Sequence, residues 1–162
     1  MKLQFCLQTA VSDLNFIQKI PKRKEFKLWI KTALEAVSLK HLKANNIELT
    51  IRLVDEKESA ALNEQYRAKT GPTNILSFAA ENLMEIDSYY LGDLLICVPL
   101  VIQEAAEQNK TCIAHWAHLT VHGVLHLLGY DHEKAKDAMV MERFETTILK
   151  NLGYPDPYAD VV

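Results

Sequence analysis

The segment HGVLHLLGYDH, residues 122–132, constrains the fold of this chain more than any other stretch. Residues four apart lie on one face of an α-helix, about 5–6 Å from each other, so His122 and His126 can approach the same ligand. Gly129 can adopt the left-handed conformation that ends a helix, and the reversal after it can bring His132 back to that ligand. The spacing therefore predicts a helix, a tight turn and three converging imidazoles.

Three imidazoles and a water form the open tetrahedral site that is typical of catalytic zinc. The alternative is three ordinary histidines beside a core helix. That alternative is weaker because three of the six histidines fall within eleven residues that also hold the hinge glycine. We therefore expect one Zn²⁺ per chain, bound by His122, His126 and His132, although nickel and copper also bind such sites.

Two further residues beside this motif have two interpretations each. His118 stands one helical turn before His122, and Asp131 directly precedes His132. Either side chain can orient a ligand imidazole by a hydrogen bond. Equally, His118 can be a packed core histidine, and aspartate is favoured in turns for its own backbone contacts. The spacing leaves both roles open.

Gly123 occupies the position at which HExxH zinc peptidases carry their general-base glutamate. Peptide hydrolysis needs a proton delivered to the leaving amine, so the glycine disfavours a peptidase. A phosphodiester makes a different demand, because its transition state carries negative charge that a metal and a guanidinium stabilise together. Zinc also lowers the pKa of its water to about 7 without a carboxylate base. Phosphodiester chemistry is therefore the better fit.

A cation for this role is available in NEQYRAKTGPTNILSF, which predicts the end of a helix, a turn and a strand. Arg67 and Lys69 stand where that helix closes. The planar guanidinium of arginine matches phosphate. The alternative is a surface arginine that the helix dipole favours at a C-terminus, and the spacing alone does not separate the two.

The composition is ordinary for a globular protein, and 162 residues suit one domain. The chain has no apolar run of membrane-spanning length and its start lacks the features of a signal peptide, so we expect a cytoplasmic protein without a membrane partner. The three cysteines are widely spaced, which disfavours disulfides and cysteine-rich zinc sites. A net charge of −3 gives no sign of a polyanion-binding surface.

Hydrophobic periodicity predicts a single α+β domain over residues 1–162, in which helices pack on a small mixed β-sheet. The expected strands are LQFCLQ (3–8), IELTIRLV (47–54), NILSFA (74–79) and LGDLLICV (91–98). The expected helices are 22–40, a segment from Asp55 through Tyr66, two segments after Pro99 and 133–152, and residues 81–90 are expected to be a loop. The second helix after Pro99 carries the histidines.

Three segments, HGVLHLLGYDH, LNEQYRAKTGPTNILSF and LGDLLIC, together resemble the bacterial YbeY family of metal-dependent endoribonucleases. The similarity extends from the first strand to GYPDPY near the end. It implies that the three histidines of the motif bind zinc, and that Arg67 belongs to the catalytic cleft. Thr73, Asn74 and Ser77 match a block that lines the cleft, where they position substrate or shape the turn.

One departure from the family pattern concerns the residues before PTN, which are commonly acidic and basic but here are Thr70 and Gly71. This departure leaves Lys69 as the nearby cation and changes a local substrate contact, not the metal site.

The resemblance implies a zinc-dependent endoribonuclease that cuts single-stranded RNA, matures the 3′ end of small-subunit rRNA and acts in ribosome quality control. Its implied partners are a ribosomal protein and an assembly GTPase, and no DNA substrate is expected. The attacking group is either a zinc-bound water or the ribose 2′-hydroxyl. Two alternatives stay open: a metallohydrolase for another substrate such as a peptide, and a non-catalytic ribosome-assembly factor with a structural zinc.

Overall fold

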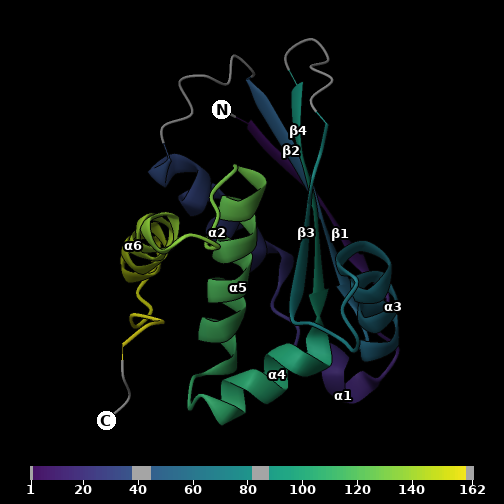
Figure 1. The fold of residues 1–162 in the computed structure, drawn as a ribbon. Helices are drawn as coiled ribbons and strands as arrows, with labels where there is room; N and C mark the ends of the chain where they lie inside the picture. The colour runs from purple at the N-terminus through teal and green to yellow at the C-terminus, as the bar shows by residue number, and fades with distance from the viewer. Residues whose placement is uncertain (1, 38–44, 82–87, 160–162) are drawn as a thin grey trace.

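A four-stranded mixed sheet with helices on both faces makes up this protein (Figure 1). The structure is a computed structural model that describes residues 2–37, 45–81 and 88–159. Helices α2 and α5 cover one face of the sheet, α6 packs outside them, and α3 lies on the opposite face (Figure 1). The predicted α+β architecture is confirmed. Within these ranges no helix is long and apolar enough to cross a membrane.

The sheet has the strand order β1-β2-β4-β3. Its strands are β1 (Lys2–Thr9), β2 (Asn46–Val54), β3 (Ile75–Ala79) and β4 (Ser88–Cys97). The first three in spatial order run parallel, and β3 is antiparallel to β4 at the edge. Buried and half-buried residues alternate along β2, as the sequence predicted, because successive side chains point to opposite faces.

The prediction of a loop over 81–90 was wrong for its last three residues. Ser88, Tyr89 and Tyr90 begin β4 and pair with the first three residues of β2. Their partners lie about 40 residues away in the chain, and this long-range pairing gives the segment an order that its own pattern does not encode. Residues 82–87 lie outside the described part of the chain.

Six helices occur in the described ranges. They are α1 (Leu14–Ile17), α2 (Arg23–Ala36), α3 (Glu56–Arg67), α4 (Val98–Glu107), α5 (Cys112–Leu127) and α6 (Ala135–Asn151). The short α1 was not predicted. The prediction for α2 extended to residue 40, but Val37 is already extended and 38–40 lie outside the described residues. The six residues predicted to form its apolar face, Phe26, Trp29, Ile30, Ala33, Leu34 and Val37, are all buried.

Helix α5 packs closely on the sheet because position 123 has no side chain. A Cβ built on Gly123 would lie 2.7 Å from Cδ1 of Ile75 in β3 and 2.8 Å from Cδ2 of Leu94 in β4. Residue 123 therefore faces the buried interface between helix and sheet. The adjacent His122 is half-buried and lines a cavity, so the close contact at Gly123 fixes which face of α5 the histidines occupy.

This packing predicts that Gly123→Glu destabilises the fold instead of restoring a peptidase base. The larger side chain would overpack the interface and bury a carboxylate without a partner, at an expected cost of roughly 3 kcal/mol or more. Urea denaturation followed by circular dichroism measures this cost. Ala61→Glu, at an exposed position of α3, is the matched control. Equal unfolding midpoints for the two variants would contradict the packing argument.

Candidate metal centre and active-site cleft

Helix α5 carries four histidines along one side of an otherwise apolar helix. The hydroxyl of Thr111 caps its first turn by accepting from the backbone N–H of Ala114 at 3.2 Å. At its other end Gly129 has a φ of +99°, and Tyr130 N donates to the Leu125 carbonyl at 3.0 Å. The predicted glycine-ended helix is therefore present, and the chain reverses directly after it.

The reversal brings His132 to His122 and His126. One ligand nitrogen from each of the three side chains lies within 4.8 Å of the others. The two Nε2 atoms of His122 and His126 are 3.0 Å apart, close to the separation of about 3.4 Å that Zn–N bonds of about 2.0–2.1 Å require in a tetrahedron. The donor set therefore fits a zinc ion, and its imidazole nitrogens converge from one helix and the turn that follows.

Neighbouring histidines and burial keep His126 neutral. Burial, followed by the charges of His122 and His132, lowers the pKa of His126 to about 4. A histidine binds a metal only in its neutral form, so this environment favours the ligand state at neutral pH.

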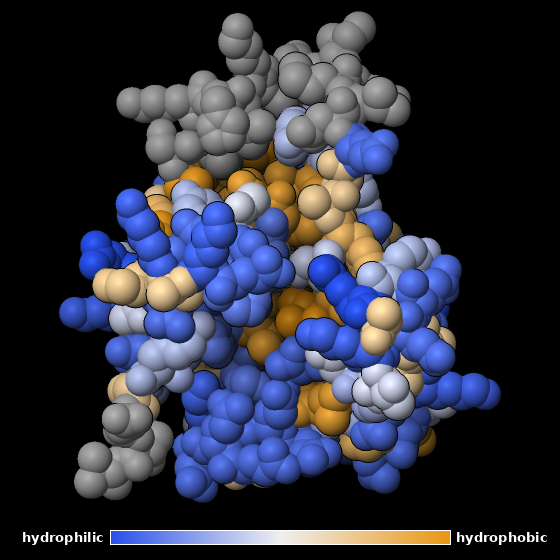
Figure 2. All heavy atoms as spheres, viewed as in Figure 1, coloured by the Kyte–Doolittle hydropathy of each residue, from blue (hydrophilic) through white to orange (hydrophobic). Residues whose placement is uncertain are grey.

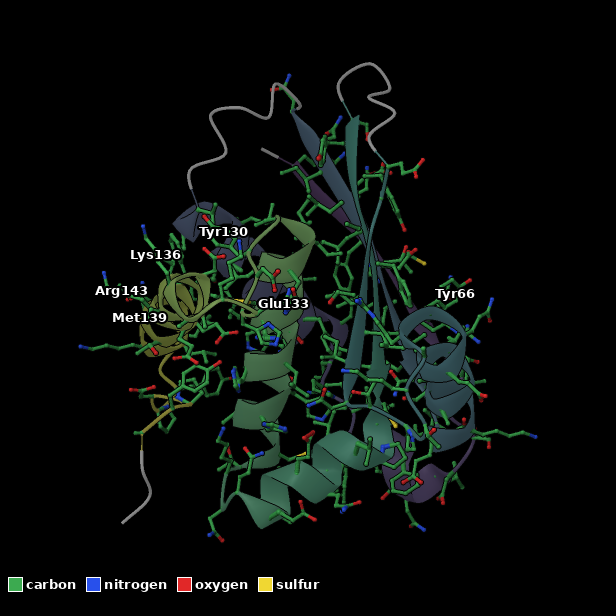
Figure 3. All side chains as sticks on the ribbon, in the orientation of Figure 1. Tyr66, Tyr130, Glu133, Lys136, Met139 and Arg143 are labelled. Atoms are coloured by element: carbon green, nitrogen blue, oxygen red, sulfur yellow. The ribbon has the colours of Figure 1, made fainter. Side chains whose placement is uncertain are left out.

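Asp131 acts on the backbone of the turn. Its Oδ1 accepts from the backbone N–H of His132 at 2.6 Å and of Glu133 at 3.2 Å. These two hydrogen bonds lower the pKa of the carboxyl group. The chain after Asp131 folds back across α5. In Figure 3, Glu133 lies in front of that helix, whereas Lys136 and Met139 lie on α6. Asp131 thus holds the backbone that carries His132.

A buried carboxylate of α6 contacts His122, one of the three clustered histidines. Glu145 is fully buried, and its Oε1 accepts a hydrogen bond from Nδ1 of His122. Its Oε2 accepts from the hydroxyl of Tyr158 and lies 3.7 Å from Nε2 of His118. Burial alone would raise the pKa of Glu145, but hydrogen bonding to its neighbours and the charge of His122 lower it to about 2. The carboxyl group is therefore ionised at neutral pH.

Neither Glu145 nor Tyr158 was predicted as a site residue. One signal for Glu145 was present in the sequence: the apolar face of α6 is formed by Met141, Ile148 and Leu149, and Glu145 is the charged residue on that face. A charge at a core position marks a buried partner. Nothing in the spacing identifies that partner as His122, which is 23 residues away.

His118 lies between the three-histidine group and the end of the described chain. Its Nε2 is 3.4 Å from the hydroxyl of Tyr158, and the two rings meet edge to face at 5.4 Å. Burial lowers its pKa, and the nearby Glu145 opposes this effect. His118, His122 and Glu145 form a second group whose ligand atoms lie within 4.8 Å of each other. His118 is thus packed against the site and does not belong to the three-histidine group.

A cavity of about 360 Å³ lies directly beside His122. Helices α4 and α5, the start of β3 and the segment after α6 supply its walls, among them Asn74, Glu104, Lys110, His118 and Tyr158. Asn74 Nδ2 donates to Glu104 Oε2 at 3.1 Å, and Glu104 Oε1 lies 3.5 Å from His115 Nε2. The volume is in the range of small-ligand sites, so a group bound there would lie next to His122 of the three-histidine group.

Arg67 is the last residue of α3 and is exposed. Its Nη2 donates to the Ser77 carbonyl of β3 at 3.0 Å, and no salt bridge of its guanidinium occurs within the described ranges. The other four of its five N–H donors therefore have no acceptor among the residues that the structure describes. The guanidinium is held against the edge strand with free donors for an anion.

The turn between α3 and β3 is fixed by two buried side chains of α3. Ser59 Oγ donates to the Thr73 carbonyl and accepts from the Thr73 N–H, at 2.8 and 2.9 Å. Asn63 Nδ2 donates to the Gly71 carbonyl at 2.8 Å. Thr73 therefore shapes the turn through its backbone. The side chain of Lys69 is exposed, and Asn74 is the residue of the PTN block that shares a cavity with His122.

Between α5 and α3 the surface is hollowed, with hydrophobic atoms on the floor and hydrophilic atoms around the rim (Figure 2). A second cavity, of about 640 Å³, is lined by Tyr66, Phe78 and other residues, but by none of the predicted site residues. Of the predicted site residues, Asn74, His118 and His122 line the smaller cavity.

The family described as Endoribonuclease YbeY matches residues 13–153 of the chain. The chain belongs to this family. Endoribonuclease YbeY of Nitrosococcus oceani is 51% identical over 163 residues, which cover 99% of this chain and 100% of the relative. Endoribonuclease YbeY of Colwellia psychrerythraea is 49% identical over 142 residues, which cover 88% and 90%. Membership in the YbeY family confirms the resemblance and the predicted enzyme class, a nuclease.

The fold is also similar to the solution structure of TM1509 from Thermotoga maritima. That structure has a TM-score of 0.52 and 22% sequence identity, and the match covers 97% of this chain and 100% of the other. At this identity the likeness concerns the fold alone, and it agrees with a single α+β arrangement.

We predict that Asn63→Ala loosens the turn between α3 and β3. The substitution removes the buried amide that holds the Gly71 carbonyl, and we expect the free energy of unfolding to fall by roughly 1–2 kcal/mol. Urea denaturation measures the change. Gln65→Ala, at an exposed position of the same helix, should change it by less than about 0.5 kcal/mol, and an equal loss in both variants would refute the role of the amide.

Proposed function

We propose that this chain is a zinc-dependent endoribonuclease that is specific for single-stranded RNA and acts on small-subunit rRNA in the cytoplasm. The observation that carries the proposal is the convergence of three imidazole nitrogens in a member of the YbeY family. Maturation of the rRNA 3′ end, ribosome quality control, and contacts with ribosome-assembly proteins belong to the same proposal.

His122, His126 and His132 would hold the ion, because their nitrogens lie at ligand separations and His126 stays neutral. A bound zinc supplies Lewis acidity toward a phosphoryl oxygen and makes water a competent nucleophile near neutral pH. Residue 123 faces the sheet, so no side chain there could serve as the general base of a peptidase. The orientation of Gly123 toward the sheet therefore favours hydrolysis of a phosphodiester over hydrolysis of a peptide.

Arg67 would bind the phosphate as the catalytic cation. Its guanidinium is anchored by one donor to the Ser77 carbonyl and offers the others to an anion. Charge that develops on the phosphoryl oxygens would be stabilised by these donors. Asn74, in the cavity beside His122, would contact the flanking nucleotide, and Lys69 would add a second, exposed positive charge.

The first experiment pairs metal content with RNA cleavage for wild type, His126→Ala and Arg67→Ala. We expect about one zinc per wild-type chain and cutting of single-stranded but not duplex RNA. His126→Ala should lose both properties. Arg67→Ala should keep the zinc and lose roughly 100-fold or more in cleavage rate, because a positioned donor to the transition state is removed.

Arg143→Ala is the matched control, because it removes the same charge from the exposed side of α6, where Arg143 points away from α5 (Figure 3). Its cleavage rate should equal that of wild type. If wild type keeps zinc but cuts no RNA, and zinc is needed only for folding, the chain is an assembly factor with a structural ion. Cleavage of peptides by the zinc protein would support the other metallohydrolase.

A second experiment identifies the nucleophile by placing a 2′-deoxyribose immediately 5′ of the cut. We propose attack by water, so cleavage should persist at the substituted linkage, and the products of the all-ribose RNA should carry no 2′,3′-cyclic phosphate. Loss of cleavage at that linkage alone, with cutting elsewhere intact, would instead establish attack by the ribose 2′-hydroxyl. Mass spectrometry of the cut ends separates the two results.

A further inference from the structure

Glu145 occupies a position where a hydrophobic residue would be expected. It lies on the inner face of α6 with Met141 and Ile148, and none of its surface is exposed. An ionised carboxylate is costly to bury unless hydrogen bonds and charges compensate it. Burial of this carboxylate therefore requires a specific hydrogen-bond partner, and the contacts of Glu145 identify it.

Oε1 of Glu145 accepts from Nδ1 of His122. A neutral imidazole carries one proton, so a hydrogen bond donated by Nδ1 leaves the lone pair on Nε2. Nε2 of His122 is the atom that lies 3.0 Å from Nε2 of His126 in the three-histidine group. The carboxylate thus acts on the nitrogen that faces away from the ion and aims the other nitrogen at it.

The second oxygen keeps the carboxylate in place. Oε2 accepts from the hydroxyl of Tyr158 and lies 3.7 Å from Nε2 of His118. Contacts from α5 on one side and from the segment after α6 on the other leave the Glu145 side chain little freedom. The orientation of His122 therefore depends on residues that follow it in the chain by 23 and 36 positions.

We propose that Glu145 is a positioning residue that fixes the tautomer and ring orientation of His122 for metal binding, with Tyr158 holding the carboxylate. This inference rests on the proposed zinc site. Carboxylates that hydrogen-bond a ligand histidine raise metal affinity by roughly 10–100-fold. Because Glu145 and Tyr158 belong to the C-terminal part of the chain, metal binding and docking of that part stabilise each other.

The test compares Glu145→Gln with Glu142→Gln, which removes an exposed carboxylate three residues earlier on α6. Zinc affinity is measured by competition with a chromophoric chelator, and folding of the metal-free proteins by circular dichroism. We expect Glu145→Gln to bind zinc roughly 10–100-fold more weakly and Glu142→Gln to match wild type. Zinc should also raise the unfolding temperature of wild type by more than that of Glu145→Gln.

A second measurement does not depend on whether Glu145→Gln folds. In metal-free wild type, ¹⁵N spectra of the imidazoles should show His122 protonated at Nδ1. Protonation at Nε2 instead would overturn the inference. Equal zinc affinities for wild type and Glu145→Gln would also overturn the inference, but they would not contradict the proposed zinc site.

The stoichiometry distinguishes the remaining outcomes. Two zinc ions in wild type, one of which is lost in Glu145→Gln, would make Glu145 a ligand of a second ion with His118 and His122, and would overturn its role as a positioning residue. Wild type that binds no zinc while His122 is protonated at Nδ1 would refute the proposed zinc-dependent function, not the geometry at Glu145.

Discussion

The close contact between α5 and the sheet is the constraint on which the site depends. Gly123 lets the helix approach Ile75 and Leu94, and once that residue faces the sheet, the histidines at 122 and 126 must lie to the side of it. The same geometry places Ile75 and His122 around one cavity. Gly123, at the position where a peptidase has its general base, is thus required for packing, and under the proposed function the chemistry must proceed without a side chain there.

The site is assembled from segments that are far apart in sequence. Helix α5 and its turn supply the imidazoles, Asn74 directly precedes β3 and its amide donates to Glu104 of α4, and the C-terminal part supplies Glu145 and Tyr158. The proposed catalytic cation, Arg67, is held between α3 and the edge strand. Arg67, Asn74 and His122 are each oriented by a hydrogen bond to a different element. The placement of these groups therefore depends on the packing of the whole domain, and under the proposed zinc site a buried carboxylate on the last helix can affect the first histidine of the three-histidine group.

The sequence pattern predicted those parts of the site that depend on residues close to one another in the chain. The spacing of His122, His126 and Gly129 was sufficient for the helix, its end and the return of His132. The pairing of Ser88–Tyr90 with β2 and the contact between Glu145 and His122 were not predicted, because both depend on partners more than 20 residues away. The charge of Glu145 on an apolar helix face could have indicated a buried partner, but only the docking of α6 identifies it.

The charge of the chain bears on how such a site would meet its substrate. Proteins that bind RNA through its phosphates alone rely on many Lys and Arg contacts, whereas this chain has a net charge of −3. Under the proposed function, attraction to RNA would then be local and would come from the ion, Arg67, Lys69 and the cavity-lining Lys110. Such short-range contacts suit the chemical step more than capture of free RNA. The contacts with ribosome-assembly proteins that belong to the same proposal would then add to the affinity for the substrate.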